Sequence, residues 1–254
     1  MPRLANRTEP RILCVAVPKA GTHLLERALC LHPRLYRKLV PTVSSYNIHR
    51  WGDLPVLLPK VRPGQIIVSH HHYEATRAQA VRDNRVKCIF MMRDPRDMAV
   101  SRAFYLPNPK VQWHPQHAIF AEQPDVRSRI LLSIKGYAPT DFLSIKDTIG
   151  EFAGWEQPDF LLIRFEDLIG EAGGSTVARQ HESLARIYDY LEMPMTTPVL
   201  HDLAARLFSR KSPTFNKGVV GRWTEFFDEE VKQIFKENAG AELIQYGYEQ
   251  DDTW

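Results

Sequence analysis

Residues 11–24 read RILCVAVPKAGTHL, and this stretch decides the fold. Its apolar first half ends at Pro18, which is typical of a strand buried inside a parallel sheet. Apolar residues with helical spacing begin at His23, and we expect Thr22 to cap the helix that they form. The stretch therefore predicts a strand, a tight loop and a helix in direct succession.

The same alternation continues along the chain. Further buried strands are predicted at 66–70, 86–92 and 160–164, a loop is predicted at 194–198, and helices are predicted at 74–85, 94–105, 126–135, 142–152, 175–191 and 229–246. Strands that alternate with helices predict an α/β fold whose mostly parallel central sheet is flanked by helices. We expect a single domain over residues 1–254, because no repeat or linker divides the sequence.

The composition is that of a soluble globular protein. Of the 254 residues, 44% are hydrophobic and 25% are charged, and the net charge is +3. That charge is too small to predict nucleic-acid binding, although it leaves room for one local site for a small polyanion. Three cysteines without CxxC spacing favour a reducing compartment, and we expect Cys14 and Cys88 to be buried. With a polar N-terminus and no run of about 20 apolar residues, the sequence predicts a cytoplasmic protein.

The loop PKAGT at residues 18–22 is the first candidate anion site. Backbone amides at a helix N-terminus point outward, and the helix dipole favours an anion there. Gly21 allows a close backbone approach to a ligand, Lys19 adds a charge, and Thr22 adds a hydroxyl. An ordinary strand-to-helix turn with a solvated lysine is the alternative. The loop is not a Walker A loop, because its lysine precedes the glycine.

The second candidate segment, RDPRDMAVS at residues 93–101, directly follows a predicted strand. Arg93 lies at the carboxyl end of that strand, where ligands bind in open α/β sheets. Ser101 comes two helical turns later, so both side chains can meet one phosphate. The alternative is an ion pair between Arg93 and Asp97 at the start of the helix.

The third candidate segment, FNKGVVGRW, occupies residues 215–223. Two glycines, two cations and an aromatic residue suit a loop that folds over an anionic ligand. A solvated surface loop is the alternative for this segment taken alone.

Together the three segments resemble the family of sulfotransferases that use 3′-phosphoadenosine 5′-phosphosulfate (PAPS). The family motif PKSGTxW is similar to PKAGTHL at 18–24, and R-[ND]-P-[KR]-D-x-A-V-S matches residues 93–101 throughout. The family motif RKGxxGDW is similar to NKGVVGRW at 216–223, and YEDL is similar to FEDL at 165–168. The resemblance keeps the family order and spans residues 18–249.

The resemblance implies a P-loop-like nucleotide site, with PAPS as co-substrate, 3′,5′-diphosphoadenosine (PAP) as product and no metal. The nucleotide-binding residues that it implies are Lys19, Ala20, Gly21, Thr22, His23, Leu24, Arg93, Ser101, Phe165, Lys217 and Gly218. The chain departs from the motifs where Leu24, Phe165, Asn216 and Arg222 replace a tryptophan, a tyrosine, a basic residue and an aspartate.

The family places a catalytic histidine where three consecutive histidines end the strand predicted at 66–70. The Ser69–His70 pair favours His70, whereas an ungapped count back from Arg93 favours His71. Adjacent strand residues face opposite sides, so only one can serve and the three rings cannot converge on a metal. Histidine suits a base because its unperturbed pKa lies near neutrality.

In the implied mechanism, His70 takes a proton from the hydroxyl or amine of a small-molecule acceptor. Lys19 and the amides that follow it stabilise the leaving oxygen. We expect the acceptor to contact the irregular segments 33–63 and 107–124, and we expect no nucleic acid and no membrane as partners. We also consider a homodimer as a partner interaction of this chain. The alternatives are a P-loop-type nucleotide kinase and a non-catalytic module that binds PAP or another polyanion.

Overall fold

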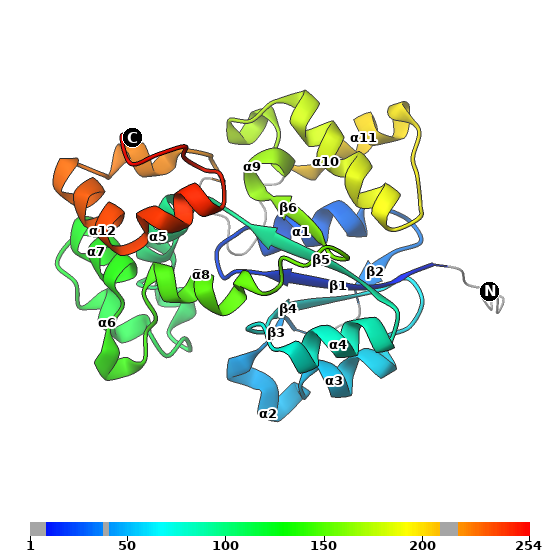
Figure 1. Ribbon diagram of the computed structural model, residues 1–254, viewed down its shortest axis with the longest axis horizontal. Helices are drawn as coiled ribbons and strands as arrows, with labels where there is room; N and C mark the ends of the chain where they lie inside the picture. The colour runs from blue at the N-terminus through cyan, green and yellow to red at the C-terminus, as the bar shows by residue number, and fades with distance from the viewer. Residues whose placement is uncertain (1–8, 38–40, 209–217) are drawn as a thin grey trace. The chain divides into compact units, whose positions relative to one another are not determined.

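The computed structural model describes residues 9–37, 41–208 and 218–254, and the chain forms two compact units (Figure 1). The first unit comprises residues 1–92 and 152–209, and the second comprises residues 93–151 and 210–254. Each unit therefore combines segments that are distant in the sequence. The single domain expected over residues 1–254 stays a prediction.

The first unit is built on a parallel sheet. Among the described residues its strands are β1 (Arg11–Ala16), β2 (Tyr36–Arg37), β3 (Val43–Ser44), β4 (Gln65–His70), β5 (Val86–Met92) and β6 (Leu161–Arg164). The order is β2-β4-β1-β5-β6, with β3 also paired to β4, and each of these pairings is parallel. The mostly parallel sheet expected from the sequence is confirmed.

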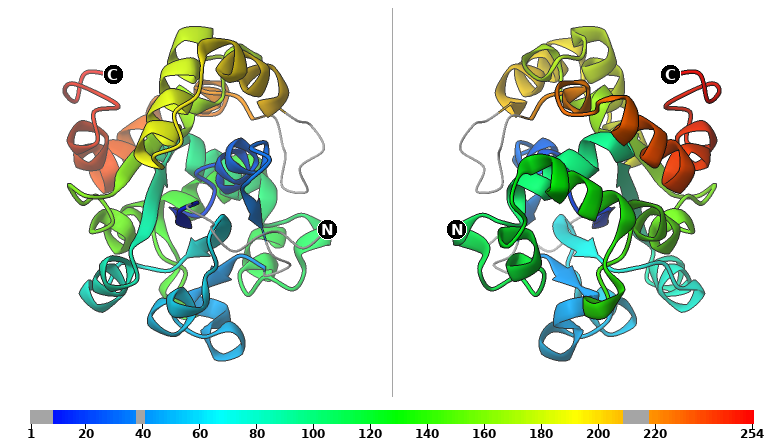
Figure 2. Two further views of the ribbon diagram at one scale, coloured as in Figure 1. Left: turned by 90° about the vertical axis from the view of Figure 1, so that its right-hand side faces the viewer. Right: turned by 90° about the vertical axis from the view of Figure 1, so that its left-hand side faces the viewer.

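The central strands are apolar on both faces because helices cover both faces. Every residue from Ile12 to Ala16 is 0% exposed, as is Cys88 in β5. The helices of this unit are α1 (Thr22–Cys30), α2 (Ile48–Trp51), α3 (Leu54–Leu57), α4 (Ala75–Asp83), α9 (Phe165–Leu168), α10 (Val177–Tyr190) and α11 (Thr197–Leu207). Figures 1 and 2 show α1 and α9–α11 on one side of the sheet and α3 and α4 on the other. This is the arrangement typical of parallel sheets.

Three local expectations were wrong. The segments 33–63 and 107–124, expected to be irregular, contain short strands and helices: β2, β3, α2 and α3 in the first, and a helix at His117–Ala121 in the second. Thr22 does not cap α1: the N-cap is Gly21, which has a φ of 103° and gives no side-chain hydrogen bond, so Thr22 is the first helical residue. The loop expected at 194–198 is shorter, because α11 begins at Thr197 with Pro198 in its first turn. Proline is tolerated there, since the amide that it lacks has no partner inside the helix.

The second unit is helical. Its helices are α5 (Pro95–Tyr105), α6 (His117–Ala121), α7 (Val126–Lys135), most of α8 (Ile145–Ala153) and α12 (Glu229–Gln245). Helix α5 follows β5 almost immediately, and its N-cap Asp94 accepts a hydrogen bond of 2.8 Å from the amide of Arg96. It packs against α7 and α12 through a fully buried core that includes Met98, Ile130 and Phe235.

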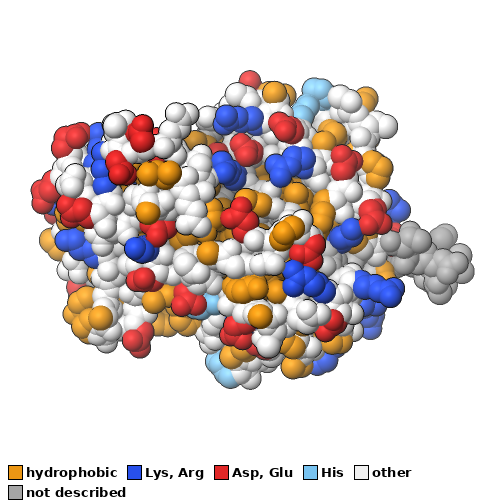
Figure 3. Space-filling view, in the orientation of Figure 1, with side chains coloured by type: hydrophobic (Ala, Val, Ile, Leu, Met, Phe, Trp, Pro, Cys, Tyr) orange, Lys and Arg blue, Asp and Glu red, His pale blue; other side chains and the backbone are white. Residues whose placement is uncertain are grey.

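The described surface carries both signs of charge. On the face seen in Figure 3, Lys and Arg side chains are interspersed with Asp and Glu, which fits the small net charge of +3. No helix in residues 9–37, 41–208 and 218–254 is long and apolar enough to cross a membrane.

Candidate functional site

The loop between β1 and α1 is held in a conformation that leaves helix amides at its tip. Lys19 and Gly21 both have positive φ values, 76° and 103°. The amide of Ala20 donates to the carbonyl of Val17 (2.9 Å), and the amide of Leu24 donates to the carbonyl of Gly21 (2.8 Å). The amides at the very start of a helix have no acceptor inside that helix. The loop is therefore suited to an anion.

Phe165, which begins α9, lies directly against this loop. A Cβ atom on Gly21 would lie 2.4 Å from Cδ2 of Phe165 and 3.3 Å from Cε of Met91. Phe165 is only 4% exposed, so its ring is packed among protein atoms where it meets the loop. Position 21 therefore requires glycine for its space as well as for its φ.

The remaining predicted residues of the loop differ in exposure. Ala20 is fully buried, and Thr22 is 8% exposed. His23 is 39% exposed, and its Nδ1 lies 3.5 Å from Oε2 of Glu26. Lys19 and Leu24 are half-buried. Lys19, Thr22 and His23 are therefore the polar side chains that the loop offers.

His70, the last residue of β4, lies beside the end of β1. Its Nδ1 is 2.7 Å from the carbonyl oxygen of Ala16, the residue that ends β1. A carbonyl oxygen only accepts, so Nδ1 carries the proton and Nε2 carries the lone pair. Burial, together with the positive charges of His23 and Lys19, lowers the pKa of His70 to about 4. The ring is therefore neutral at pH 7 and can accept a proton at Nε2.

His71 has different surroundings. Its side chain is 0% exposed, its Nδ1 lies 2.9 Å from Oγ of Ser69, and its Nε2 lies 3.7 Å from Oδ1 of Asp53 without a hydrogen bond. Its carbonyl accepts a hydrogen bond of 3.0 Å from the indole of Trp155. Burial, with the positive charge of Arg77, lowers the pKa of His71 to about 4. The His71 ring is therefore enclosed by protein atoms, whereas the His70 residue is only half-buried.

In the second unit, Arg93 and Asp97 join the start of α5 to the C-terminal segment. Nη2 of Arg93 donates to Oδ2 of Asp97 (3.2 Å) and to the carbonyl of Val219 (2.9 Å). Asp97 also accepts from the amides of Gly221 (2.9 Å) and Trp223 (3.0 Å). Burial raises the pKa of Asp97, and the Arg93 guanidinium opposes that rise. The ion pair that the sequence offered as an alternative for Arg93 is present.

A small hollow of about 20 Å³ lies at this junction and brings together residues from two predicted segments. Its walls include Arg93, Ser101, Gly218 and Arg222. Arg93, which follows β5, and Ser101 of α5 therefore line one space, as their positions at the strand end and two turns into the helix suggested. Lys217, the other predicted residue of this segment, lies outside the described residues.

The contacts that fix this C-terminal segment were not found from the sequence. The guanidinium of Arg96 lies against the rings of both Trp223 and Trp254, with its Cζ atom 4.0 Å and 4.5 Å from their centroids. The same side chain pairs with Asp94 at 2.7 Å and Glu249 at 2.5 Å. The motif at 93–101 contains two of these residues, but nothing in it indicates their partners more than 120 residues away.

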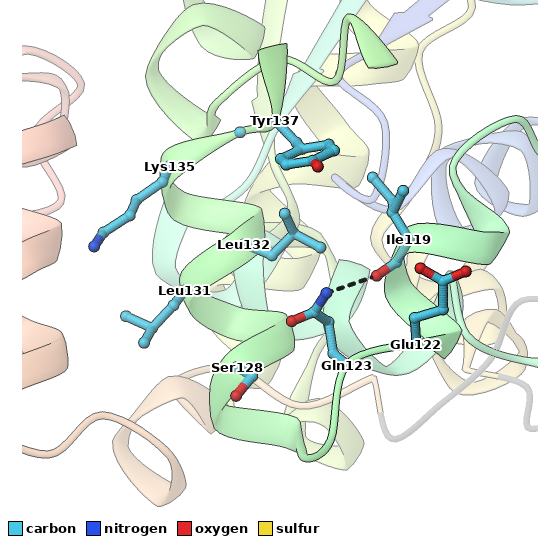
Figure 4. A pocket seen from close by; sticks show the side chains of 9 residues that line it. Ile119, Glu122, Gln123, Ser128, Leu131, Leu132, Lys135 and Tyr137 are labelled. Carbon is cyan, nitrogen blue, oxygen red and sulfur yellow. Dashed lines mark hydrogen bonds between the residues drawn. The ribbon is translucent and has the colours of Figure 1, made fainter. Parts of the chain in front are cut away.

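A larger cavity of about 410 Å³ opens between α6 and α7 of the second unit (Figure 4). Ile119, Leu132 and Tyr137 form its apolar wall, and Glu122 and Lys135 are charged residues of its lining. Its size falls in the range of small-molecule sites. Helix α6 belongs to the segment 107–124 that we expected to contact an acceptor.

Comparisons with known proteins agree with the motifs. A family model described as a sulfotransferase domain matches residues 9–247. Human sulfotransferase 2A1 is 22% identical over 253 residues, an alignment that covers 89% of this chain and 83% of the relative. Mouse sulfotransferase SULT7A1 complexed with PAP has a similar structure, with a TM-score of 0.66, 21% identity and coverage of 92% and 84% of the two chains. Retinol dehydratase in complex with androsterone and inactive cofactor PAP gives a TM-score of 0.58, 16% identity and coverage of 91% and 80%.

Proposed function

Since this chain belongs to the sulfotransferase family, we propose that it transfers the sulfuryl group of PAPS to a hydroxyl or amine of a small acceptor and releases PAP. The resemblance drawn from the motifs and the assignment as a sulfotransferase enzyme are confirmed. The observation that carries the mechanism is the hydrogen bond from His70 to the carbonyl of Ala16, which sets a neutral imidazole beside the phosphate-binding loop.

The loop has the chemistry that a phosphosulfate requires. Lys19 and Thr22 supply a cation and a hydroxyl, and the first amides of α1 supply donors beside the positive end of a helix dipole. PAPS brings an activated sulfuryl group, and these residues hold it and stabilise the charge that develops on the leaving oxygen. The relatives whose structures carry PAP support this choice of nucleotide.

His70 acts as the base in this proposal. As the acceptor oxygen or nitrogen forms its bond to sulfur and the bond to the leaving phosphate oxygen breaks, Nε2 of His70 takes the acceptor's proton. The Ala16 carbonyl accepts a hydrogen bond from Nδ1–H, and this hydrogen bond becomes stronger when the ring becomes positive. Fully buried His71 has a supporting role through Ser69 and Trp155.

Within the second unit, one group of residues suits a 3′-phosphate. Arg93, Ser101 and Gly218 line one hollow, and the motif implies Lys217, which lies outside the described residues, as a further ligand. A phosphate monoester is bound strongly by guanidinium groups and hydroxyls. The proposal therefore predicts that the chain distinguishes PAP from nucleotides that lack a 3′-phosphate.

The acceptor is proposed to be a small and partly apolar alcohol, phenol or amine. Retinol and androsterone are the compounds named with the similar retinol dehydratase structures. Of the two segments expected to contact an acceptor, 33–63 includes the exposed aromatic side chain of Tyr46, and 107–124 includes that of Trp113. A cytoplasmic location, supported by three free cysteines, and a homodimer stay predictions.

The test is turnover of ³⁵S-labelled PAPS with a panel of phenols, alcohols, amines and sugars. His70→Ala should lower the rate by about 100- to 10,000-fold, the usual contribution of a general base, while PAP affinity stays close to that of the parent chain. His71→Ala is the matched control and should act mainly on stability. Normal rates in both variants and in the double variant would remove the histidine mechanism. PAP binding without turnover on any acceptor would favour the non-catalytic module.

A further inference from the structure

Arg222 is a buried cation at a position where the motif RKGxxGDW has an aspartate. It begins a short 3-10 helix at Arg222–Glu225, and its side chain is 9% exposed. Its Nε atom is buried and makes no hydrogen bond within the described residues. Since a buried donor without an acceptor is costly, the atom is placed to meet an acceptor that residues 9–37, 41–208 and 218–254 do not supply.

Two aromatic rings hold the Arg222 guanidinium in place. Its Cζ atom lies 4.3 Å from the centroid of Phe104 and 5.3 Å from the centroid of Phe226. Ring faces attract cations and hold the charged group without using its N–H donors. The carboxylate that approaches it, that of Glu225, is 4.0 Å from Nε, beyond hydrogen-bond distance, and is 50% exposed.

The charges around this hollow favour an anion. Arg222 and Arg93 both line it, and Asp97 is the acidic residue of its wall. Asp97 already accepts from Arg93 and from two backbone amides. Burial lowers the pKa of the Arg222 guanidinium, the carboxylates of Glu225 and Asp97 oppose that shift, and the guanidinium stays charged. Among the residues that line the hollow, two cations therefore face one carboxylate that already accepts three hydrogen bonds.

We propose that Arg222 binds the 3′-phosphate of the nucleotide through its guanidinium, alongside Arg93 and the hydroxyl of Ser101. The proposal rests on the proposed function and names a ligand contact that the family motif does not contain. An aspartate at this position would repel a phosphate, whereas arginine reverses the sign of the charge. The hollow of about 20 Å³ holds little more than one water molecule, so a phosphate displaces side-chain atoms that fill it now.

A thermodynamic cycle between the arginine and the phosphate tests this contact. Calorimetry on the full chain would give the affinities of PAP and AMP for the parent, for Arg222→Gln and for Arg93→Gln. We expect Arg222→Gln to weaken PAP by about 10- to 100-fold, the effect of losing a charged hydrogen bond, and to change AMP affinity by less than about threefold. Arg222→Lys keeps the positive charge but not the planar guanidinium, so its affinity for PAP should fall between those of the parent and Arg222→Gln.

Arg129→Gln is the matched control. Its guanidinium donates to the carbonyls of Phe120 and Gln123 in the same unit, so this variant removes one positive charge without touching the hollow. It should leave the preference for PAP over AMP unchanged. If Arg129→Gln weakens PAP as much as Arg222→Gln, the effect is one of net charge and the proposal is overturned.

The remaining outcomes separate this proposal from the function itself. If the parent prefers PAP over AMP, Arg93→Gln loses that preference and Arg222→Gln keeps it, then Arg222 is no phosphate ligand while the function stands. If the parent binds PAP and AMP equally, both assignments fail. Should Arg222→Gln not fold, Arg222→Lys gives the answer, because its stem still packs on Phe104, and unchanged PAP affinity in it would overturn the proposal.

Discussion

Replacing Gly21 by alanine tests the geometry of the phosphate-binding loop. Gly21 has a φ of +103°, and a Cβ atom there would lie 2.4 Å from Cδ2 of Phe165. A left-handed backbone costs alanine about 1–2 kcal/mol, and moving a packed ring away from an added methyl costs roughly 1–3 kcal/mol. We therefore expect Gly21→Ala to lower the free energy of unfolding by about 2–5 kcal/mol.

Repeating Gly21→Ala in a chain that also carries Phe165→Ala separates the backbone strain from the clash with the ring. Phe165→Ala alone should lower the free energy of unfolding by about 3–5 kcal/mol, because it removes a buried ring. In that background the added methyl meets no ring, and its remaining tight contact is the flexible end of Met91, so Gly21→Ala should cost mainly the backbone strain of about 1–2 kcal/mol. The difference between the two costs of Gly21→Ala is the coupling between the positions.

Urea unfolding of the full chain, followed by circular dichroism, measures each value. Gly150→Ala is the control: Gly150 lies within α8, and a Cβ atom there would meet nothing within 4 Å. That change should raise stability by about 0.5–1 kcal/mol, because alanine is the better helix former. The reasoning is refuted if Gly21→Ala costs less than about 0.5 kcal/mol, or costs the same with and without the Phe165 ring.

Three further predictions concern titration, nucleotide choice and thiol access. Because the pKa of His70 is lowered to about 4, its imidazole stays neutral down to roughly pH 5. The maximal rate should therefore be level from pH 8 to pH 5 and fall below pH 5. A fall centred near pH 6.5 would contradict the buried surroundings of His70. PAP at about 100 times its dissociation constant should add roughly 2.7 kcal/mol of stability, far more than AMP at the same concentration, and equal shifts in melting temperature would count against the 3′-phosphate site. Cys30 is exposed whereas Cys14 and Cys88 are buried, so Ellman's reagent should label one thiol in the folded chain and three in urea; rapid labelling of a second thiol would show that the sheet opens.

The strands were predictable because parallel strands are buried on both faces. Such strands appear in the sequence as continuous apolar runs, and the run at 86–92 coincides with β5 at both ends. The position of α11 was missed because Pro194 and Pro198 suggested a loop, whereas a proline in the first turn of a helix is stable. The capping of α1 was missed because the left-handed φ of Gly21 replaces the side-chain cap that Thr22 offered.

The site was predictable only in its local parts. Arg93, directly after β5, and Ser101, on the helix α5 that follows, line one hollow as predicted, because a strand end and the first turns of the next helix are close in the sequence. The interpretation of Arg93 as either a phosphate ligand or a partner of Asp97 was too exclusive: the ion pair exists, and Arg93 still lines the hollow. The contact from Arg93 to Val219 spans 126 residues, and no local pattern encodes such a contact.

The choice between two adjacent histidines shows which property assigns a base. His70 and His71 both have a pKa of about 4, so titration alone does not separate them. Their hydrogen bonds separate the two histidines. Val15 of β1 lies opposite Ser69 of β4, so the next residues, Ala16 and His70, lie side by side. The carbonyl of Ala16 can therefore accept a hydrogen bond from the His70 ring. A slip of one residue would turn each side chain to the opposite face of the sheet. The pairing of β1 with β4 therefore places the His70 ring, our proposed base, beside the end of β1, from which the proposed phosphate-binding loop starts.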